Sequence, residues 1–331
     1  MIPKEKLKTY WKQFTESPRA KQFQSVFRKI LIAVIVSIIA YQLWDIGWSE
    51  VLSSLPTHPL FYVLFFVLYL TLPTGEVFIY RQVWVVKRWE TFKAFLTKRV
   101  YNEEVMGYSG EFYLFMWARK YVGKSEKEVL KNVRDNNILS AVTSNLVAVT
   151  LIGLLIFTGV IDVEDIFGNV NLVYVTTGFL VVAALITLFI QFRKYIFDLP
   201  LRKALIVFGI YLSRFLIHHT LLIVQWAIVI PDTPLSIWFL FLAIIIIVNR
   251  IPFIPSRDLV FMWAGIELSR MLDMATAAVA GMLLVSSALK KSTNLILFLL
   301  ISYYSKDPEI KMMREKSKAT SNSGKEEANQ K

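Results

Sequence analysis

Cysteine is absent from the 331-residue chain, and histidine occurs only three times. The lack of cysteine excludes disulfide bonds, cysteine nucleophiles and thiolate metal sites. Charged residues are also scarce, at 19%, whereas an average soluble domain has about 25%. Together with 55% hydrophobic residues and a mean hydropathy of +0.51, this composition excludes disordered, collagen-like and coiled-coil chains and indicates a polytopic membrane protein.

Motifs of common ATPases and hydrolases are missing as well. The chain contains no complete Gly-x-x-x-x-Gly-Lys-Ser/Thr loop, no His-Glu-x-x-His and no Gly-x-Ser-x-Gly. The longest polar insert, residues 120–137, leaves no room for a soluble catalytic domain. We therefore expect no cofactor and no metal ion. Enzymatic activity is disfavoured but stays open, since membrane-embedded transferases can work with carboxylates and arginines alone.

Positive charge is in excess, with 37 Lys and Arg against 25 Asp and Glu, a net charge of +12 and a pI near 9.6. In a soluble protein such an excess would indicate nucleic acid binding. In a chain this apolar, basic residues are typical of cytoplasmic loops that face anionic lipid headgroups. We therefore expect membrane lipids with anionic headgroups as partners and no nucleic acid, and the sequence identifies no protein partner.

The two ends of the chain differ from its apolar centre. Residues 1–29 hold eight Lys or Arg and two acids, interspersed with aromatic residues. This pattern is typical of an interfacial segment on the cytoplasmic face and not of a cleavable signal peptide. Residues 306–331 are polar and rich in Ser, Lys and Glu, which predicts a disordered tail. The transmembrane domain is expected at residues 30–305.

Six apolar segments approach the ~20 helical residues that a bilayer core requires. They are residues 30–46, 60–80, 138–161, 170–192, 205–230 and 235–249. Loops 45–58 and 162–169 lack Lys and Arg, whereas loops 81–134, 193–203 and 250–257 are basic. Because basic loops stay on the cytoplasmic side, this alternation predicts a multi-pass protein of the inner (cytoplasmic) membrane with a cytoplasmic N-terminus.

A seventh apolar stretch, residues 275–304, is interrupted by Lys290 and Lys291. Seven Lys and Arg in the tail favour a cytoplasmic C-terminus, which requires an even number of crossings. Either this stretch forms a hairpin around the two lysines, or another segment, such as residues 259–271, also crosses. The total is therefore seven or eight transmembrane helices.

Two segments combine half-length apolar runs with residues that break helices. In residues 81–121, Gly107 and Gly110 flank a predicted break, and Pro252 and Pro255 prevent a regular helix before the short segment 259–271. Broken helices at membrane depth are tolerated where they line a protein-enclosed cavity. The predicted fold is an all-α polytopic bundle of 7–8 transmembrane helices with two re-entrant or broken helical elements.

Several charged residues lie where lipid would make them costly, by at least about 2.5 kcal/mol each. Arg214, His218 and Gln225 are spaced four and seven residues apart, so they share one helix face. They form either a site for an anionic headgroup or a proton relay, or a structural polar cluster paired with another helix. Glu111 is expected to pair with Arg119, Arg214 or Arg250. Asp135 is expected to cap the start of the third span.

Three stretches carry a family resemblance. Asp45-Ile-Gly-Trp48 is similar to an Asp-x-x-Trp element after the first span. Asn102 followed by Gly107-Tyr-Ser-Gly-Glu111 looks like an Asn…Pro-x-x-x-Gly-Glu element that lacks its proline. Residues 251–258 with Glu267 look like a Pro-x-x-Pro-Gly-Gly-x-Gly…Glu element with its glycines replaced. Over residues 29–304 the chain thus resembles the lysylphosphatidylglycerol synthase transmembrane-domain family of flippase-like integral membrane proteins.

The resemblance implies a helical bundle with two re-entrant elements around a lipid-headgroup cavity, and it implies lipid translocation or handling. In the family the Gly-Glu element precedes a helix that carries an arginine, and the resemblance assigns this position to Arg119. The leading hypothesis is a flippase-like protein that translocates or binds an amphiphilic phospho- or glycolipid. Its predicted cavity residues are Glu111, Arg119, Arg214, His218, Arg250 and Glu267. The alternatives are a proton-coupled transporter of a small polar solute and a membrane-embedded transferase for a lipid-linked substrate.

Overall fold

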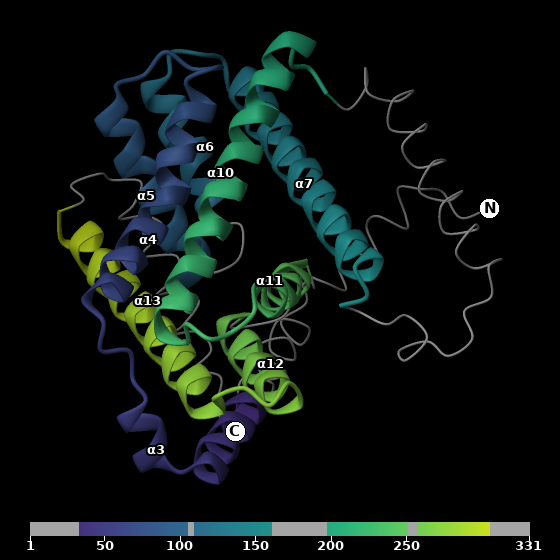
Figure 1. Cartoon of the computed structure of the whole chain (residues 1–331). Coiled ribbons are helices and arrows are strands. Elements are labelled where there is room, and N and C mark those ends of the chain that lie inside the picture. The colour runs from purple at the N-terminus through teal and green to yellow at the C-terminus, as the bar shows by residue number, and fades with distance from the viewer. Residues whose placement is uncertain (1–32, 105–108, 161–196, 251–256, 305–331) are drawn as a thin grey trace, which may run out of the picture. The chain divides into compact units, whose positions relative to one another are not determined.

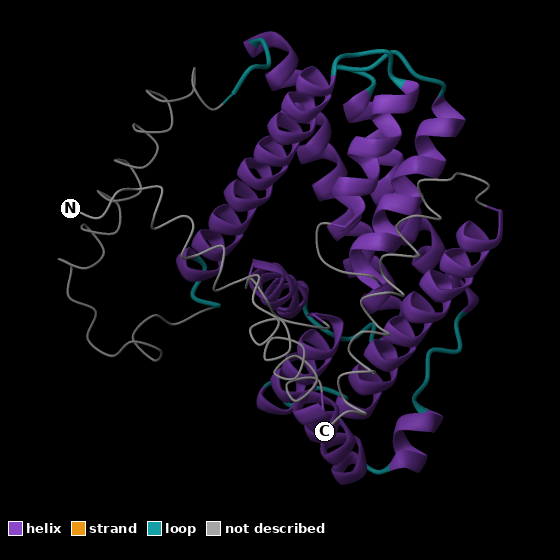
Figure 2. Ribbon diagram, turned by 180° about the vertical axis from the view of Figure 1, so that it is seen from behind, coloured by secondary structure: helices purple, strands orange, loops and turns teal. Residues whose placement is uncertain are grey.

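The computed structural model describes residues 33–104, 109–160, 197–250 and 257–304. Within these ranges every regular element is an α-helix, and there is no strand (Figure 2). The first described helix is Ala33–Ile46. The helices that follow it are α3 (Trp48–Ser53), α4 (Pro59–Tyr80), α5 (Arg88–Glu104), α6 (Ser109–Tyr121), α7 (Glu126–Phe157), α10 (Leu201–Val229), α11 (Leu235–Arg250), α12 (Arg257–Met271) and α13 (Thr276–Tyr304) (Figure 1).

Four of the described helices, α4, α7, α10 and α13, are long and apolar enough to cross a membrane. Helices α4, α7 and α10 contain most of three predicted spans, and α13 contains most of the seventh apolar stretch, so the expectation of apolar, membrane-compatible helices is confirmed at this level. The helix Ala33–Ile46 and α11 are apolar but shorter, at fewer than 18 residues, although both were predicted as spans. The predicted span at 170–192 lies outside the described residues.

Helix α13 runs without interruption from Thr276 to Tyr304, through Lys290 and Lys291. The alternative of a hairpin around the two lysines is therefore wrong. The physical reason is that lysine is a good helix former, and no Gly or Pro follows Gly281 in this helix to open a turn.

The start of α7 also differs from the prediction. The helix begins at Glu126, well before the apolar run, and Ser125 caps it together with Glu128. The Ser125 backbone N–H donates to Glu128 Oε2 at 3.2 Å, and the Glu128 N–H donates to Ser125 Oγ at 3.4 Å. This reciprocal pair is a capping box. Asp135 is therefore an interior residue of α7, and its expected role as the N-cap was wrong.

The chain divides into two compact units. Unit 1 takes in the described residues of 1–69, 140–196 and 211–288, and unit 2 those of 70–139, 197–210 and 289–331. An aromatic cluster forms part of the core of unit 1. The Trp226 ring lies 5.7 Å from that of Trp238 and 6.0 Å from that of Phe261, and Trp238 lies 5.6 Å from Phe241. Trp226, Trp238 and Phe241 are almost fully buried.

Unit 2 contains the helix pair α5 and α6, which lie side by side (Figure 1). Buried Tyr101 of α5 stacks on Tyr113 of α6 at 5.5 Å, and Phe298 of α13 packs edge-on against Tyr101. Gly110, predicted to flank a break with Gly107, is the second residue of α6, and α5 ends at Glu104. Its small size serves the close approach of α6 to α5, because a Cβ at Gly110 would lie 2.1 Å from the Lys98 carbonyl oxygen. Gly107 lies outside the described residues.

Candidate polar site

A polar cluster in unit 2 joins α5, α6 and α13, and we call it the α5 cluster. Its members are Lys98, Arg99, Asn102, Glu103, Glu111, Lys290 and Asn294. The α6 side of the cluster is centred on Glu111. Its Oε1 accepts a hydrogen bond from Asn102 Nδ2 at 3.2 Å and lies 3.6 Å from Lys98 Nζ. Glu111 Oε2 is buried and accepts no hydrogen bond from the described residues.

The α13 side of the cluster is centred on Glu103. Glu103 Oε2 accepts a hydrogen bond from Asn294 Nδ2 at 2.6 Å and lies 3.5 Å from Lys290 Nζ. Its Oε1 lies 3.3 Å from Arg99 Nε, one helical turn back along α5. Asn294 is fully buried, and the side chains of Glu103 and Lys290 are each 26% exposed. A carboxylate, two cations and an amide thus meet where little water reaches them.

Helix geometry explains why these residues come together. Lys98 and Asn102 are four residues apart, as are Arg99 and Glu103, so the four lie on one side of α5. Lys290 and Asn294 have the same spacing on α13. Glu111 stands in the first turn of α6, where the helix dipole favours a carboxylate. Gly110 lets α6 approach, and its N–H donates to Asn102 Oδ1 at 2.7 Å.

A second polar group, in unit 1, links the helix Ala33–Ile46 to α12. Gln42 Nε2 donates to Glu267 Oε2 at 3.1 Å, and Arg270 Nη2 lies 2.9 Å from Asp45 Oδ2. Arg270 also donates to the Gln42 carbonyl oxygen at 3.4 Å. Gln42 is buried, whereas the Glu267 side chain is exposed. Asp45 and Glu267 come from two motifs of the family resemblance. Both take part in the contacts between the helix Ala33–Ile46 and α12.

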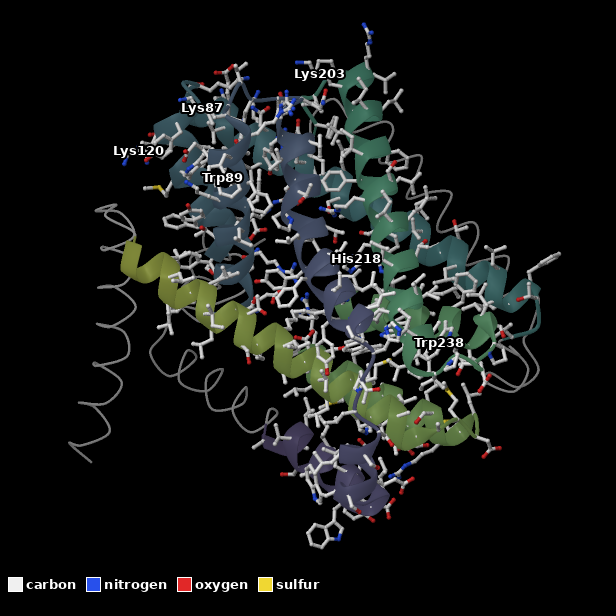
Figure 3. The ribbon with its side chains drawn as sticks, turned by 60° about the vertical axis from the view of Figure 1, so that its left-hand side comes forward. Lys87, Trp89, Lys120, Lys203, His218 and Trp238 are labelled. Carbon is white, nitrogen blue, oxygen red and sulfur yellow. The ribbon has the colours of Figure 1, made fainter. Side chains whose placement is uncertain are left out.

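The polar face of α10 belongs to unit 1 as well. The Arg214 guanidinium carbon lies 4.8 Å from the centre of the Tyr211 ring, and the His218 and His219 rings meet edge to face at 5.3 Å. His218 lies in the middle part of α10 (Figure 3). Gln225 is buried, and its Nε2 donates to the Phe61 carbonyl oxygen at 2.9 Å. For Gln225 this contact favours the structural interpretation over a headgroup site.

The predicted cavity residues that the structure describes are distributed over both units. Arg119 is not brought to Glu111. It pairs instead with Glu126 at 2.6 Å, with side chains 41% and 65% exposed, because it lies two turns further along α6. Glu111 and Arg119 belong to unit 2, whereas Arg214, His218 and Glu267 belong to unit 1. The Arg250 side chain, Pro252 and Pro255 lie outside the described residues.

The predicted site omitted most of the α5 cluster. Lys98, Arg99 and Glu103 lie in the segment predicted as a re-entrant or broken element, and neither they nor Asn294 are among the predicted cavity residues. The signal that could have found them is the four-residue spacing of opposite charges and amides in the segment 98–103, which repeats at Lys290 and Asn294. The pairing between α5 and α13, nearly two hundred residues apart in sequence, has no local signal.

Asp135 makes a contact that the prediction missed. Its side chain is 1% exposed, and its Oδ2 accepts hydrogen bonds from the backbone N–H groups of Asp198 and Leu199, both at 2.9 Å. Arg134 Nε donates to Asp135 Oδ1 at 2.9 Å and its Nη2 also bonds Asp198. Lys131 Nζ lies 2.7 Å from Asp198 Oδ1. These contacts fasten the segment before α10 to α7.

Gly123-Lys124-Ser125 matches the last three residues of a phosphate-binding loop, although Ala118 stands where that motif has its first glycine. The structure does not form such a loop here. Helix α6, not a strand, precedes the segment, and Ser125 is engaged in the capping box with Glu128. The Glu128 carboxylate stands at the helix start, where a phosphate would have to bind.

The described residues contain no group of three or more His, Asp or Glu side chains that could hold a metal ion. Comparison of the chain with models of protein families, with curated proteins and with solved structures finds no match. The function must therefore be argued from the polar groups of each unit.

Proposed function

We propose that the chain binds an amphiphilic lipid and moves its polar headgroup through the membrane along the α5 cluster. The observation that carries the proposal is the contact of Glu103 with Lys290 and Asn294 on α13. Lys290 is the central residue of this 29-residue helix, about 21 Å from either end at 1.5 Å per residue. In an α13 that spans a bilayer, the ion pair lies near mid-depth.

Charged groups at that depth are costly and are retained mainly where they line a path for polar or ionic groups. A lipid headgroup needs such a path, because the hydrocarbon core offers it no hydrogen-bond partners. The α5 cluster supplies cations for a phosphate, carboxylates for an ammonium or hydroxyl group, and amides for either. Within this proposal α5 and α6, with 17 and 13 residues, form a re-entrant element that does not cross the membrane.

The test is lipid translocation by the purified full chain in liposomes that contain phospholipids with a fluorescent group. We expect translocation by the wild type. The double variant Glu103→Gln/Lys290→Met is expected to be at least about tenfold slower, a barrier increase of about 1.4 kcal/mol. Removing both charges together leaves neither Glu103 nor Lys290 without the other. Because Arg99 also loses its contact with Glu103, the folding of the double variant is checked first.

Lys291→Met is the matched control, because the exposed Lys291 is the next residue of the same helix and lies on another face. It is expected to translocate at the wild-type rate. Absence of translocation by the wild type, or wild-type rates in a correctly folded double variant, would contradict the proposal.

Proton-coupled transport of a small polar solute is the second candidate, and Glu111 favours it. Glu111 Oε2 is buried and accepts no hydrogen bond from the described residues, so it is an acceptor that a polar solute can use. In the same liposomes, a pH gradient would then drive solute uptake that Glu111→Gln abolishes. Lipid translocation that is independent of the gradient would favour the first candidate.

A further inference from the structure

The corner between α4 and α5 in unit 2 exposes apolar and basic side chains side by side. Val85 is 98% exposed and Trp89 is 64% exposed. Arg81, Lys87 and Arg88 are exposed around them. Glu90 is the only acidic residue between positions 77 and 102.

The backbone that presents these side chains is firmly held. Trp84, the neighbour of Val85, is buried against Tyr80, with 4.4 Å between ring centres, and Tyr80 packs on Phe95 of α5 at 4.9 Å. The Trp84 N–H donates to the Tyr80 carbonyl oxygen at 2.7 Å. Val85 is therefore exposed because the buried residue before it fixes the chain, and not because the segment lacks contacts.

The first turn of α5 fixes the backbone that carries the basic side chains. Thr91, which is fully buried, donates to the Lys87 carbonyl oxygen from both its N–H, at 3.0 Å, and its hydroxyl, at 2.8 Å. Trp89 stacks on Phe92 with ring centres 5.6 Å apart, and Lys93 Nζ lies 5.5 Å from the centre of the Trp89 ring. Lys87, Trp89 and Lys120 lie at the same end of unit 2 (Figure 3).

We propose that this corner, formed by Val85, Lys87, Arg88, Trp89 and Lys93, is a binding site for the headgroups of anionic phospholipids. Tryptophan and valine enter the boundary between headgroups and acyl chains, where an indole ring is most stable. The lysines and arginine contact the phosphates at that level, and each basic group near an anionic surface strengthens binding about fivefold. Charge complementarity makes an anionic lipid the occupant rather than a neutral one.

The test measures quenching of tryptophan fluorescence of the full chain in two kinds of bilayer, each with equal amounts of phosphatidylglycerol and phosphatidylcholine. Only the phosphatidylglycerol is brominated in the first, and only the phosphatidylcholine in the second. The contribution of Trp89 is obtained by subtracting the same measurement on Trp89→Phe. We expect stronger quenching by the brominated anionic lipid. Lys87→Ser/Arg88→Ser should weaken the preference for the anionic lipid by about fivefold for each residue removed.

The control is Arg202→Ser/Lys203→Ser, which removes two exposed basic residues at the start of α10 in the same unit. It should leave the preference at Trp89 unchanged. Equal quenching of Trp89 by both lipids, no quenching by either, or an undiminished preference in Lys87→Ser/Arg88→Ser would overturn the proposal. The measurement involves no lipid translocation, so its outcome is independent of the proposed transport function.

Discussion

At Gly110 the contact between α5 and α6 leaves no room for a side chain. A Cβ at this position would lie 2.1 Å from the Lys98 carbonyl oxygen and 2.8 Å from the Asn102 side chain. Alanine is otherwise better than glycine inside a helix by about 1 kcal/mol. The clash outweighs this gain, so Gly110→Ala is expected to lower the free energy of unfolding by about 1–3 kcal/mol. Denaturant titration of the chain in micelles measures it.

Gly153 provides the control, because it lies in α7 and no atom lies within 4 Å of a Cβ built there. Gly153→Ala should be neutral or stabilising by up to about 1 kcal/mol. If Gly110→Ala behaved like Gly153→Ala, the close packing of α6 on α5 would be wrong.

Single residues also show how far sequence reasoning reached into the site. Glu111 was singled out as a charge in a costly place, and the structure buries it partly against Lys98 and Asn102. Its expected partners were arginines, whereas the observed cation is a lysine one helix away. Which cation pairs with Glu111 depends on how α5 and α6 pack, and Gly110 permits their close approach. From the sequence alone, a glycine that permits close packing cannot be distinguished from one that breaks a helix.

Among the elements, α7 and α10 are connected through charged groups outside the apolar runs. Lys131 and Arg134 donate hydrogen bonds to Asp198, and these bonds hold the pKa of the Asp198 carboxyl below its ordinary value of 3.8. A carboxylate with a lowered pKa in the folded state stabilises that state above its unfolded pKa. The stabilisation is lost as the pH falls through the folded-state pKa.

We therefore expect the wild type to be more stable than Asp198→Asn at neutral pH, with a difference that shrinks below about pH 4. Thermal unfolding of both proteins in micelles, from about pH 7 to about pH 2.5, measures the difference. Asp198 is exposed, so added salt should reduce the effect. A difference that grew on acidification would contradict this role for Asp198.

The helices themselves were largely predictable, because an apolar run of spanning length has few alternatives to a helix. The sequence predicts less well where a helix starts and whether it is interrupted. Helix α7 starts twelve residues before its apolar run, because the capping box of Ser125 and Glu128 extends it through polar sequence. Helix α13 passes through Lys290 and Lys291, because lysine is a good helix former, and Lys290 finds a partner in Glu103 where a turn was expected.

For the whole molecule, the charge excess of +12 is informative only once it is sorted along the chain. Most basic residues lie in stretches between apolar helices, where they predict orientation. Lys98 and Lys290 are different, since each contacts a carboxylate of another helix of unit 2, and Arg99 contacts one of these carboxylates from the same helix. The membrane orientation is thus predicted from exposed basic residues outside the α5 cluster. It can be tested at those residues without changing the cluster.

The orientation can be tested directly, because the chain has no cysteine of its own and single cysteines can be introduced at will. Helix α4 separates the acidic stretch around Glu50 from the basic one around Lys87, and Lys203 lies in another basic stretch. In intact cells an impermeant maleimide is expected to label Glu50→Cys. Lys87→Cys and Lys203→Cys should be labelled only after permeabilisation, since basic loops stay in the cytoplasm. Labelling of Glu50→Cys and Lys87→Cys from the same side would show that α4 does not cross the membrane.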